Sequence, residues 1–190
     1  MLLWMETSLI HTKISVDGKS RRSSMFVASM TDNNRALDGI SIFMVALTAL
    51  LFPIGLLASA NVTHRLRSYV AAMLLLEAGI LGVFVSLDLI LFFVFWELML
   101  VPLYFLILGW GSGQRAYAAT KFFIYTAAGS AFLLASALAL GFIHQADAGF
   151  LTFDYRVLAD WNGLAGSTEV FLFLGFMAAF AIKAPLFPFH

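Results

Sequence analysis

Long runs of apolar residues, separated by short polar segments, fill this chain from residue 40 onward. Each run is near the 20 or so residues that an α-helix needs to cross the hydrocarbon core of a bilayer. Core helices of soluble domains seldom reach this length, so five consecutive runs predict membrane-spanning helices. The predicted spans are residues 40–60, 69–87, 89–110 and 122–143, and a fifth that begins near residue 170 and stays apolar to the last residue.

The composition agrees with lipid as the main solvent of the chain. It is 62% hydrophobic and 12% charged, with a mean hydropathy of +0.93, whereas a soluble domain is about half apolar and a quarter charged. The formal net charge of +0 does not favour nucleic-acid binding. With no cysteine, the sequence holds no disulfide, thiolate zinc site or thiolate-ligated cluster. We expect an all-α integral membrane protein, a polytopic helical bundle, with no metal or cofactor site in this chain.

The charges of the loops predict an orientation for the bundle. Residues 61–68 and 111–121 are basic, whereas residues 144–169 are mainly acidic. Because cytoplasmic loops carry an excess of Lys and Arg, the two basic loops are expected in the cytoplasm and the acidic loop outside. Three basic residues at positions 19–22 oppose this orientation, although they lie about 18 residues before the first span, at the limit of the rule.

The pattern divides the chain into two parts. Residues 1–37 lack an apolar run long enough to span a bilayer and are expected to form an irregular N-terminal segment. Residues 38–190 are expected to form a transmembrane domain. The sequence stops inside an apolar stretch, so we interpret it as a piece of a longer protein.

The third predicted span carries a single carboxylate, Glu97, near its middle. Insertion scales assign roughly 2.5–3.5 kcal/mol to a charged Asp, Lys or Arg at the centre of a membrane helix. Such residues usually face a protein or water-filled interior and mark an ion path, which makes Glu97 a candidate site residue. The alternative is a neutral glutamic acid whose hydrogen bonds only hold helices together.

Lys183 is a second charge inside a predicted span, and Pro185 and Pro188 follow it closely. Proline removes a backbone hydrogen bond, so the last helix is expected to break near residues 183–185. In lipid, such breaks occur where protein or cavity water satisfies the freed carbonyl groups, and transporters place coupling ions there. Lys183 is therefore a second candidate; the alternative is a lysine that extends its amine to the cytoplasmic surface.

Three weaker candidates for a proton path accompany these two. Glu77 lies inside the second span, where a helix-packing carboxyl is an equally open interpretation. Tyr104 follows Glu97 by seven residues, on the same face of a regular helix, and either bonds that carboxyl or is an interfacial aromatic residue. Lys121 begins the fourth span and is interpreted mainly as an interfacial anchor, with a place in the proton path as the alternative.

Other features have structural interpretations. Asp88 is expected to cap the third span, because an aspartate side chain accepts hydrogen bonds from the free amides of a first turn. The small residues of 126–132 are expected to let helices approach closely. His144 is interpreted as a residue at the edge of a loop and not as a metal ligand, since no second ligand lies at a metal-binding spacing.

Three blocks of sequence resemble a known family. They are F-W-E-x-x-x-x-P-x-Y from residue 95, A-A-x-K-F from residue 118, and K-x-P-x-x-P-x-H from residue 183. In this order and spacing they resemble the antiporter-like membrane subunits of respiratory complex I, in particular the subunit M or chain 4 type. The resemblance covers roughly residues 38–190 and implies a truncated first repeat of a fold with two inverted five-helix repeats.

The resemblance also implies a function. Glu97 and Lys183 match the family's helix glutamate and its lysine at a broken helix, and His190 matches a histidine that opens the following loop. It implies a proton-translocating subunit of NADH–quinone oxidoreductase in a bacterial inner membrane, an enzyme by virtue of that complex. NADH, FMN, Fe–S clusters and quinone are expected in partner subunits, among other membrane subunits that include further antiporter-like ones.

The implied mechanism is a switch made of the two buried charges. At about 5 Å and an effective dielectric of 20, such a pair interacts by about 3 kcal/mol. This is comparable to the roughly 2.3 kcal/mol needed to move one charge across 100 mV. Two alternatives stay open: a subunit of a multisubunit cation/proton antiporter or membrane-bound hydrogenase, and a non-catalytic membrane scaffold.

Overall fold

A computed structural model describes residues 39–164 and 166–186. The predicted irregular segment, residues 1–37, and the candidate His190 lie outside these residues. Within them, the chain is helical, with one isolated backbone bridge between loops. The helices are α2 (Gly39–Ala58), α3 (Leu66–Val85), α4 (Leu89–Leu98), α5 (Leu100–Trp110), α6 (Arg115–Ala148), α7 (Tyr155–Asp160) and α8 (Ser167–Lys183).

The prediction of a helical membrane bundle is confirmed. Four segments are long and apolar enough to cross a membrane, with α4 and α5 together forming one of them over Leu89–Trp110. Helix α8 occupies the place of the fifth predicted span and has 17 residues within the described part of the chain. It ends at Lys183, inside the region where the double proline predicted a break.

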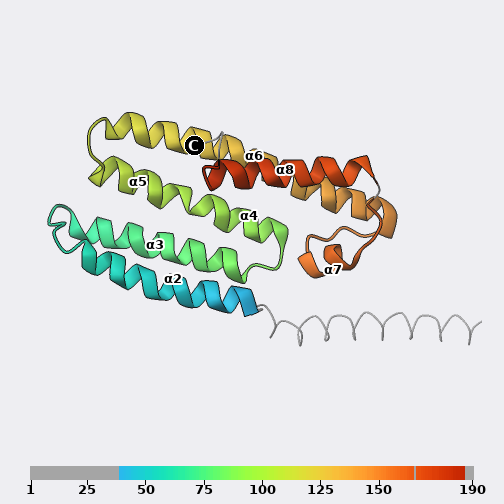
Figure 1. Ribbon diagram of the computed structural model, residues 1–190, viewed down its shortest axis with the longest axis horizontal. Coiled ribbons are helices and arrows are strands. Elements are labelled where there is room, and N and C mark those ends of the chain that lie inside the picture. Colours follow the sequence, from blue (N-terminus) through green and yellow to red (C-terminus); the bar gives the residue numbers. More distant parts are fainter. Residues whose placement is uncertain (1–38, 165, 187–190) are drawn as a thin grey trace, which may run out of the picture. The chain divides into compact units, whose positions relative to one another are not determined.

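Helix α2, helix α3, the span formed by α4 and α5, and helix α6 run side by side in alternating directions, and α8 lies against α6 (Figure 1). At one end, the backbone N–H of Leu89 donates to Phe153 O at 2.9 Å, and Tyr155 N–H donates to Leu87 O at 2.8 Å. At the other end, the Trp110 indole N–H donates to His64 O at 3.0 Å. The two basic loops therefore share one end of the bundle, as the charge alternation predicted.

Small residues let α6 and α8 approach each other closely. A Cβ atom added to Gly129 would come within 2.9 Å of Ile182 Cβ, and one added to Gly175 would meet the Ser136 hydroxyl. Thr126, Gly129 and Ser130 are buried on this side of α6. The predicted role of residues 126–132 in close packing is confirmed, and this packing places the C-terminal turn of α8 against the bundle.

The third span is divided at Met99, which joins α4 to α5. Pro102 has no N–H to donate to the carbonyl of Leu98, four residues earlier, and its ring crowds that carbonyl. Asp88 caps the N-terminus of α4 as predicted, since its Oδ1 accepts from Ile90 N–H and Leu91 N–H at 2.9 Å each. The sequence pattern gave one continuous span here, whereas the structure places an interruption directly after the turn that holds Glu97.

Helix α6 is longer than the predicted span, and this corrects the interpretation of His144. The helix continues through polar residues until Gly149, whose φ of 80° suits glycine and ends the helix. His144 is therefore inside the helix and only 2% exposed, not at the edge of a loop. Its Nδ1 lies 3.2 Å from Phe150 O.

Candidate functional site

Glu97 lies in the last turn of α4, immediately before the interruption of the third span. Its side chain is half-buried, and its Oε1 atom is buried without a hydrogen-bond partner in the described part of the chain. A buried, unsatisfied polar atom costs about 1–3 kcal/mol, and more when it carries charge. Such an atom is uncommon in a native structure and calls for a functional or structural reason.

Lys183 lies in the last turn of α8 and points its amine at α4. The Lys183 Nζ donates a hydrogen bond to the backbone carbonyl oxygen of Trp96 at 3.2 Å. The same nitrogen lies 4.8 Å from the centroid of the Trp96 ring. A cation over an aromatic face is stabilised by about 0.5–2 kcal/mol, depending on how far it is desolvated.

The structure thus brings Glu97 and Lys183 into one neighbourhood. The amine is held by the residue that directly precedes Glu97, and the two side chains are close enough to interact electrostatically. No hydrogen bond or ion pair joins the two side chains themselves, since the amine donates to Trp96 O instead. The arrangement is a lysine beside a carboxylate, with an aromatic ring and a carbonyl oxygen as its present partners.

Trp96 was missed by the sequence reasoning and is the residue that organises this neighbourhood. Its ring stacks on Phe92 at a centroid distance of 5.5 Å and meets Phe180 of α8 edge-on at 5.4 Å. These contacts fix the ring that the Lys183 amine faces. The only signal in the sequence was its position beside Glu97 in the F-W-E block.

Both charged residues lie at the C-terminal end of a helix. Glu97 precedes the junction at Met99, and Lys183 is the last residue of α8. Carbonyl groups near such junctions lack their regular intrahelical donors and can accept bonds from side chains or water. The Lys183–Trp96 hydrogen bond joins the last turn of α8 to the last turn of α4.

The weaker candidates are not part of this neighbourhood. Tyr104 meets the rings of Phe105 and Phe123 at centroid distances of 5.6 and 5.7 Å, and no hydrogen bond links it to Glu97 within the residues described. Lys121 is exposed, with its amine 5.8 Å from the centroid of Tyr117.

Glu77 also lies apart from the pair. It comes one turn after Met73, whose methyl group is the atom nearest to Gly55 of α2. Gly79, two residues further on, faces Met99 at the α4–α5 junction. Residues two apart on a helix point about 200° apart, so Glu77 lies on the α2 side of α3 and not on the side that faces α4.

The described residues hold no group of three or more His, Cys, Asp or Glu side chains that could bind a metal ion. The groups present at the site, an amine and a carboxylate in mostly apolar surroundings, support acid–base chemistry. A lysine amine can take up or release a proton, and a nearby carboxylate changes the balance between its two forms.

Comparison with known proteins agrees with the family resemblance of the sequence. Residues 86–190 match the family model described as "NADH:quinone oxidoreductase/Mrp antiporter, TM". The NADH-quinone oxidoreductase subunit M of Pseudomonas aeruginosa is 44% identical over 162 residues, which cover 82% of this chain and 32% of that protein. The subunit M of Escherichia coli strain K12 is 42% identical over 161 residues, 82% of this chain and 31% of that protein.

A plastid protein is similar to the same region. The chloroplastic NAD(P)H-quinone oxidoreductase chain 4 of Physcomitrium patens is 41% identical over 154 residues, covering 81% of this chain and 30% of that protein. This chain therefore spans about a third of the length of the curated relatives that it matches.

Proposed function

Because this chain belongs to the NADH:quinone oxidoreductase/Mrp antiporter transmembrane family, we propose that it translocates protons as part of a subunit M-type protein of NADH–quinone oxidoreductase. Electron transfer would take place in partner subunits, which would carry NADH, FMN, Fe–S clusters and quinone. The partners would include other membrane subunits, and the location would be a bacterial inner membrane. Residues 38–190 would be a partial antiporter-like domain.

In this proposal, Lys183 carries the transferred proton on its amine nitrogen and Glu97 controls it. A carboxylate close to the amine stabilises the ammonium form by about 3 kcal/mol at 5 Å and an effective dielectric of 20. When a conformational change driven by other subunits separates the two groups, an N–H bond of the ammonium breaks and the proton passes to a neighbouring acceptor. The neutral amine then takes up the next proton when the carboxylate returns.

The observation that carries this proposal is the set of contacts around Trp96. The Lys183 amine bonds to Trp96 O, while the adjacent carboxylate keeps a buried oxygen without a partner. Exchanging the Trp96 carbonyl for Glu97 Oε1 would supply that missing partner. In the proposed switch the lysine would alternate between two acceptors on adjacent residues, the Trp96 carbonyl oxygen and the Glu97 carboxylate. The path to and from this pair has four further candidates: His190, Lys121, Tyr104 and Glu77.

The test uses substitutions in the full-length parent, with NADH-driven acidification measured in inside-out vesicles and normalised to assembled complex. Glu97→Ala and Lys183→Ala should each reduce proton pumping sharply while assembly persists. Members of one coupled unit fail together, so the double variant should be far less than additively worse. Lys183→Arg should also pump poorly, because arginine does not release its proton under these conditions. Parental pumping by Lys183→Arg would refute the mechanism.

A second candidate is a subunit of a multisubunit cation/proton antiporter, because the matching family model includes such proteins in its description. The two functions predict different phenotypes for loss of the gene. The first predicts loss of inhibitor-sensitive NADH oxidation, whereas the second predicts sodium-sensitive growth with NADH oxidation unchanged. A membrane-bound hydrogenase subunit would show neither and would affect hydrogen-dependent proton movement instead.

A further inference from the structure

A groove between α3 and α5 lies at the end of the bundle that carries the two basic loops. It encloses about 660 Å³ and is lined along its length by apolar side chains of both helices. On α3 the lining residues recur every three or four positions, so they form one continuous face. The apolar lining residues include Ala71, Ala72, Leu75, Val101, Phe105 and Leu108.

The mouth of this groove is basic. His64 and Arg65 line it from the loop before α3, and Arg115 lines it from the start of α6. Arg115 Nη1 donates to Gly109 O at 3.3 Å, which leaves most of its N–H groups for other acceptors. No carboxylate is among the groove's lining residues within the part of the chain that the structure describes.

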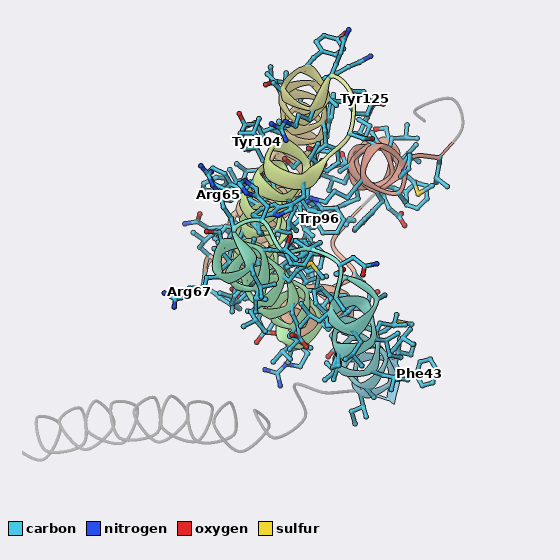
Figure 2. All side chains as sticks on the ribbon, turned by 90° about the vertical axis from the view of Figure 1, so that its left-hand side faces the viewer. Phe43, Arg65, Arg67, Trp96, Tyr104 and Tyr125 are labelled. Carbon is cyan, nitrogen blue, oxygen red and sulfur yellow. The ribbon has the colours of Figure 1, made fainter. Side chains whose placement is uncertain are left out.

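The mouth is held open by contacts that do not involve its guanidinium groups. The Trp110 indole N–H donates to His64 O, and the Trp110 ring meets Tyr69 edge-on at a centroid distance of 5.2 Å. Arg65 has a left-handed backbone with φ 50°, which turns its side chain away from the regular path into α3. Figure 2 views the bundle from this end and shows Arg65 on the side of α3 toward α5, whereas Arg67 points outward.

Two chemical requirements identify the occupant. The cations at the mouth call for an anionic group, and the apolar walls call for hydrocarbon directly beneath it. Trp and Tyr side chains are enriched at the level of the lipid headgroups, so Trp110 and Tyr69 place the basic mouth at that level. Basic pockets between membrane helices on the cytoplasmic side bind the headgroups of anionic lipids.

We propose that the α3–α5 groove binds one anionic phospholipid, with its phosphate at Arg65 and Arg115 and its acyl chains along the apolar walls. A free anion would use the mouth and leave the apolar walls open to solvent. A protein helix in the groove would bury the three basic residues unless it supplied its own carboxylates. The lipid satisfies both halves of the groove at once, and this site is separate from the Glu97–Lys183 neighbourhood.

The experiment uses the complete protein in its native assembly, extracted in detergent. The probe is phosphatidylglycerol with a photoreactive group in one acyl chain, and phosphatidylcholine with the same group is the neutral comparison. After illumination, mass spectrometry measures the labelled fraction of the peptides that line the groove. Labelling should favour phosphatidylglycerol, and excess inorganic phosphate should not displace it.

Matched variants separate the site from the general surface charge. A basic residue near an anionic lipid contributes about 1 kcal/mol, so Arg65→Gln and Arg115→Gln should each lower labelling by phosphatidylglycerol about fivefold. Arg67→Gln removes the same charge two residues away and should change labelling less than twofold. Ala71→Phe, which fills the groove without changing its charge, should reduce labelling by both lipids.

Several outcomes would overturn the proposal. Equal labelling by the two lipids would show that the mouth does not distinguish an anionic headgroup from a neutral one. Displacement by phosphate would identify a site for free anions. If Arg67→Gln lowered labelling as much as Arg65→Gln and Arg115→Gln do, the overall positive charge of this end, and not the groove, would explain the binding. Absence of any labelling would mean that another part of the assembly covers the groove.

Discussion

Two membrane helices of this protein each contain one glutamate, and the structure gives the two residues different surroundings. Glu77 lies in α3, which is unbroken over 20 residues, on the side that faces α2. Glu97 lies at the end of α4, before a proline-induced interruption, and its Oε1 is buried without a partner in the described chain. A lysine from another helix reaches the residue beside Glu97, whereas no such contact is found for Glu77 among the described residues.

The comparison teaches that a carboxylate in an apolar helix is not by itself a site. Its cost in the membrane is similar in both helices, but of these two glutamates only Glu97 also adjoins a cation and the ends of two helices, α4 and α8. A carboxylate in an apolar helix, an adjacent cation and nearby helix ends together allow a charge to change partners. Glu77 is a carboxylate in an apolar helix but lacks the other two features, which fits a role in packing α3 on α2 or a position further along a proton path.

The largest expected effect comes from comparing Glu97→Gln with Glu77→Gln in the full-length parent. Glutamine keeps the shape and the hydrogen-bonding capacity but removes the charge. Glu97→Gln should lower pumping per NADH by at least about tenfold, since an interaction change of 1.4 kcal/mol already gives that factor. Glu77→Gln should lower it less than about twofold, because no cation adjoins that residue in the described chain.

Acidification of vesicles, divided by the rate of NADH oxidation, measures both variants. The amount of assembled complex serves as the control for folding. Equal losses in the two variants would remove the distinction between the glutamates, and full pumping by Glu97→Gln would favour the scaffold interpretation.

The second effect concerns packing and compares Gly129→Ala with Gly55→Ala. A Cβ at position 129 would lie 2.9 Å from the branched Cβ of Ile182, whereas one at position 55 would meet only the end of Met73 at 3.9 Å. Overpacking of a tight contact costs about 1–3 kcal/mol, so Gly129→Ala should be destabilising. Gly55→Ala should be neutral or slightly stabilising, because alanine favours a helix over glycine by about 1 kcal/mol.

Thermal denaturation of the purified assembly in detergent, followed by loss of the intact complex, measures this pair of variants. Because Ile182 directly precedes Lys183, Gly129→Ala should also reduce pumping in the complexes that remain assembled. Equal thermal stability of the two variants would contradict the close α6–α8 packing.

The third effect concerns the ring that holds the lysine. Trp96→Phe keeps an aromatic face and should lower pumping a few-fold. Trp96→Leu removes the cation–π contact, which is worth about 0.5–2 kcal/mol, and should lower pumping further. The backbone carbonyl that accepts from Lys183 remains in both variants, so their difference reports on the ring. The measurement is again acidification per NADH oxidised, and identical rates for the two variants would exclude a role for the ring.

The spans themselves could be predicted, because lipid imposes length and apolar composition on any helix that crosses it. The cap at Asp88 and the small residues on α6 were also readable, since each follows from a local rule. The interruption at Met99 was not predicted, although Pro102 was visible in the span; whether proline bends or divides a helix depends on its neighbours. The end of α6 was missed because Gly149, and not hydropathy, ends that helix.

The site residues could be predicted from the sequence only in part, for a different reason. Glu97 and Lys183 stand out because charge is rare in these segments. Trp96 does not stand out, because its helix is apolar on all sides and the pattern does not show which face meets another helix. For the same reason the sequence left two interpretations of Tyr104 open, a partner of Glu97 or an interfacial aromatic residue, and in the structure its ring lies against Phe105 and Phe123.

The smallest expected effect lies in the loop at the acidic end and concerns Asp154. Burial of this carboxyl would raise its pKa, but hydrogen bonds and charge from Arg156 outweigh that effect and hold the pKa below the ordinary value of 3.8. The Asp154 Oδ2 and Arg156 Nη2 atoms are 3.2 Å apart. Because the folded pKa is the lower one, the stabilisation is present above the unfolded value and is lost as pH falls through the folded value.

Protection of the Tyr155 amide hydrogen, which donates to Leu87 O, reports on this loop. Its exchange rate, corrected for intrinsic pH dependence, should be constant from pH 7 to about pH 4 and should rise below that. The pair is about one third exposed, so the change should stay below about 1 kcal/mol. Asp154→Asn should abolish the acid dependence while keeping an acceptor for the Arg156 N–H, whereas Asp147→Asn in the neighbouring α6 should leave it intact. A parental acid response in Asp154→Asn would show that another group holds the two loops together.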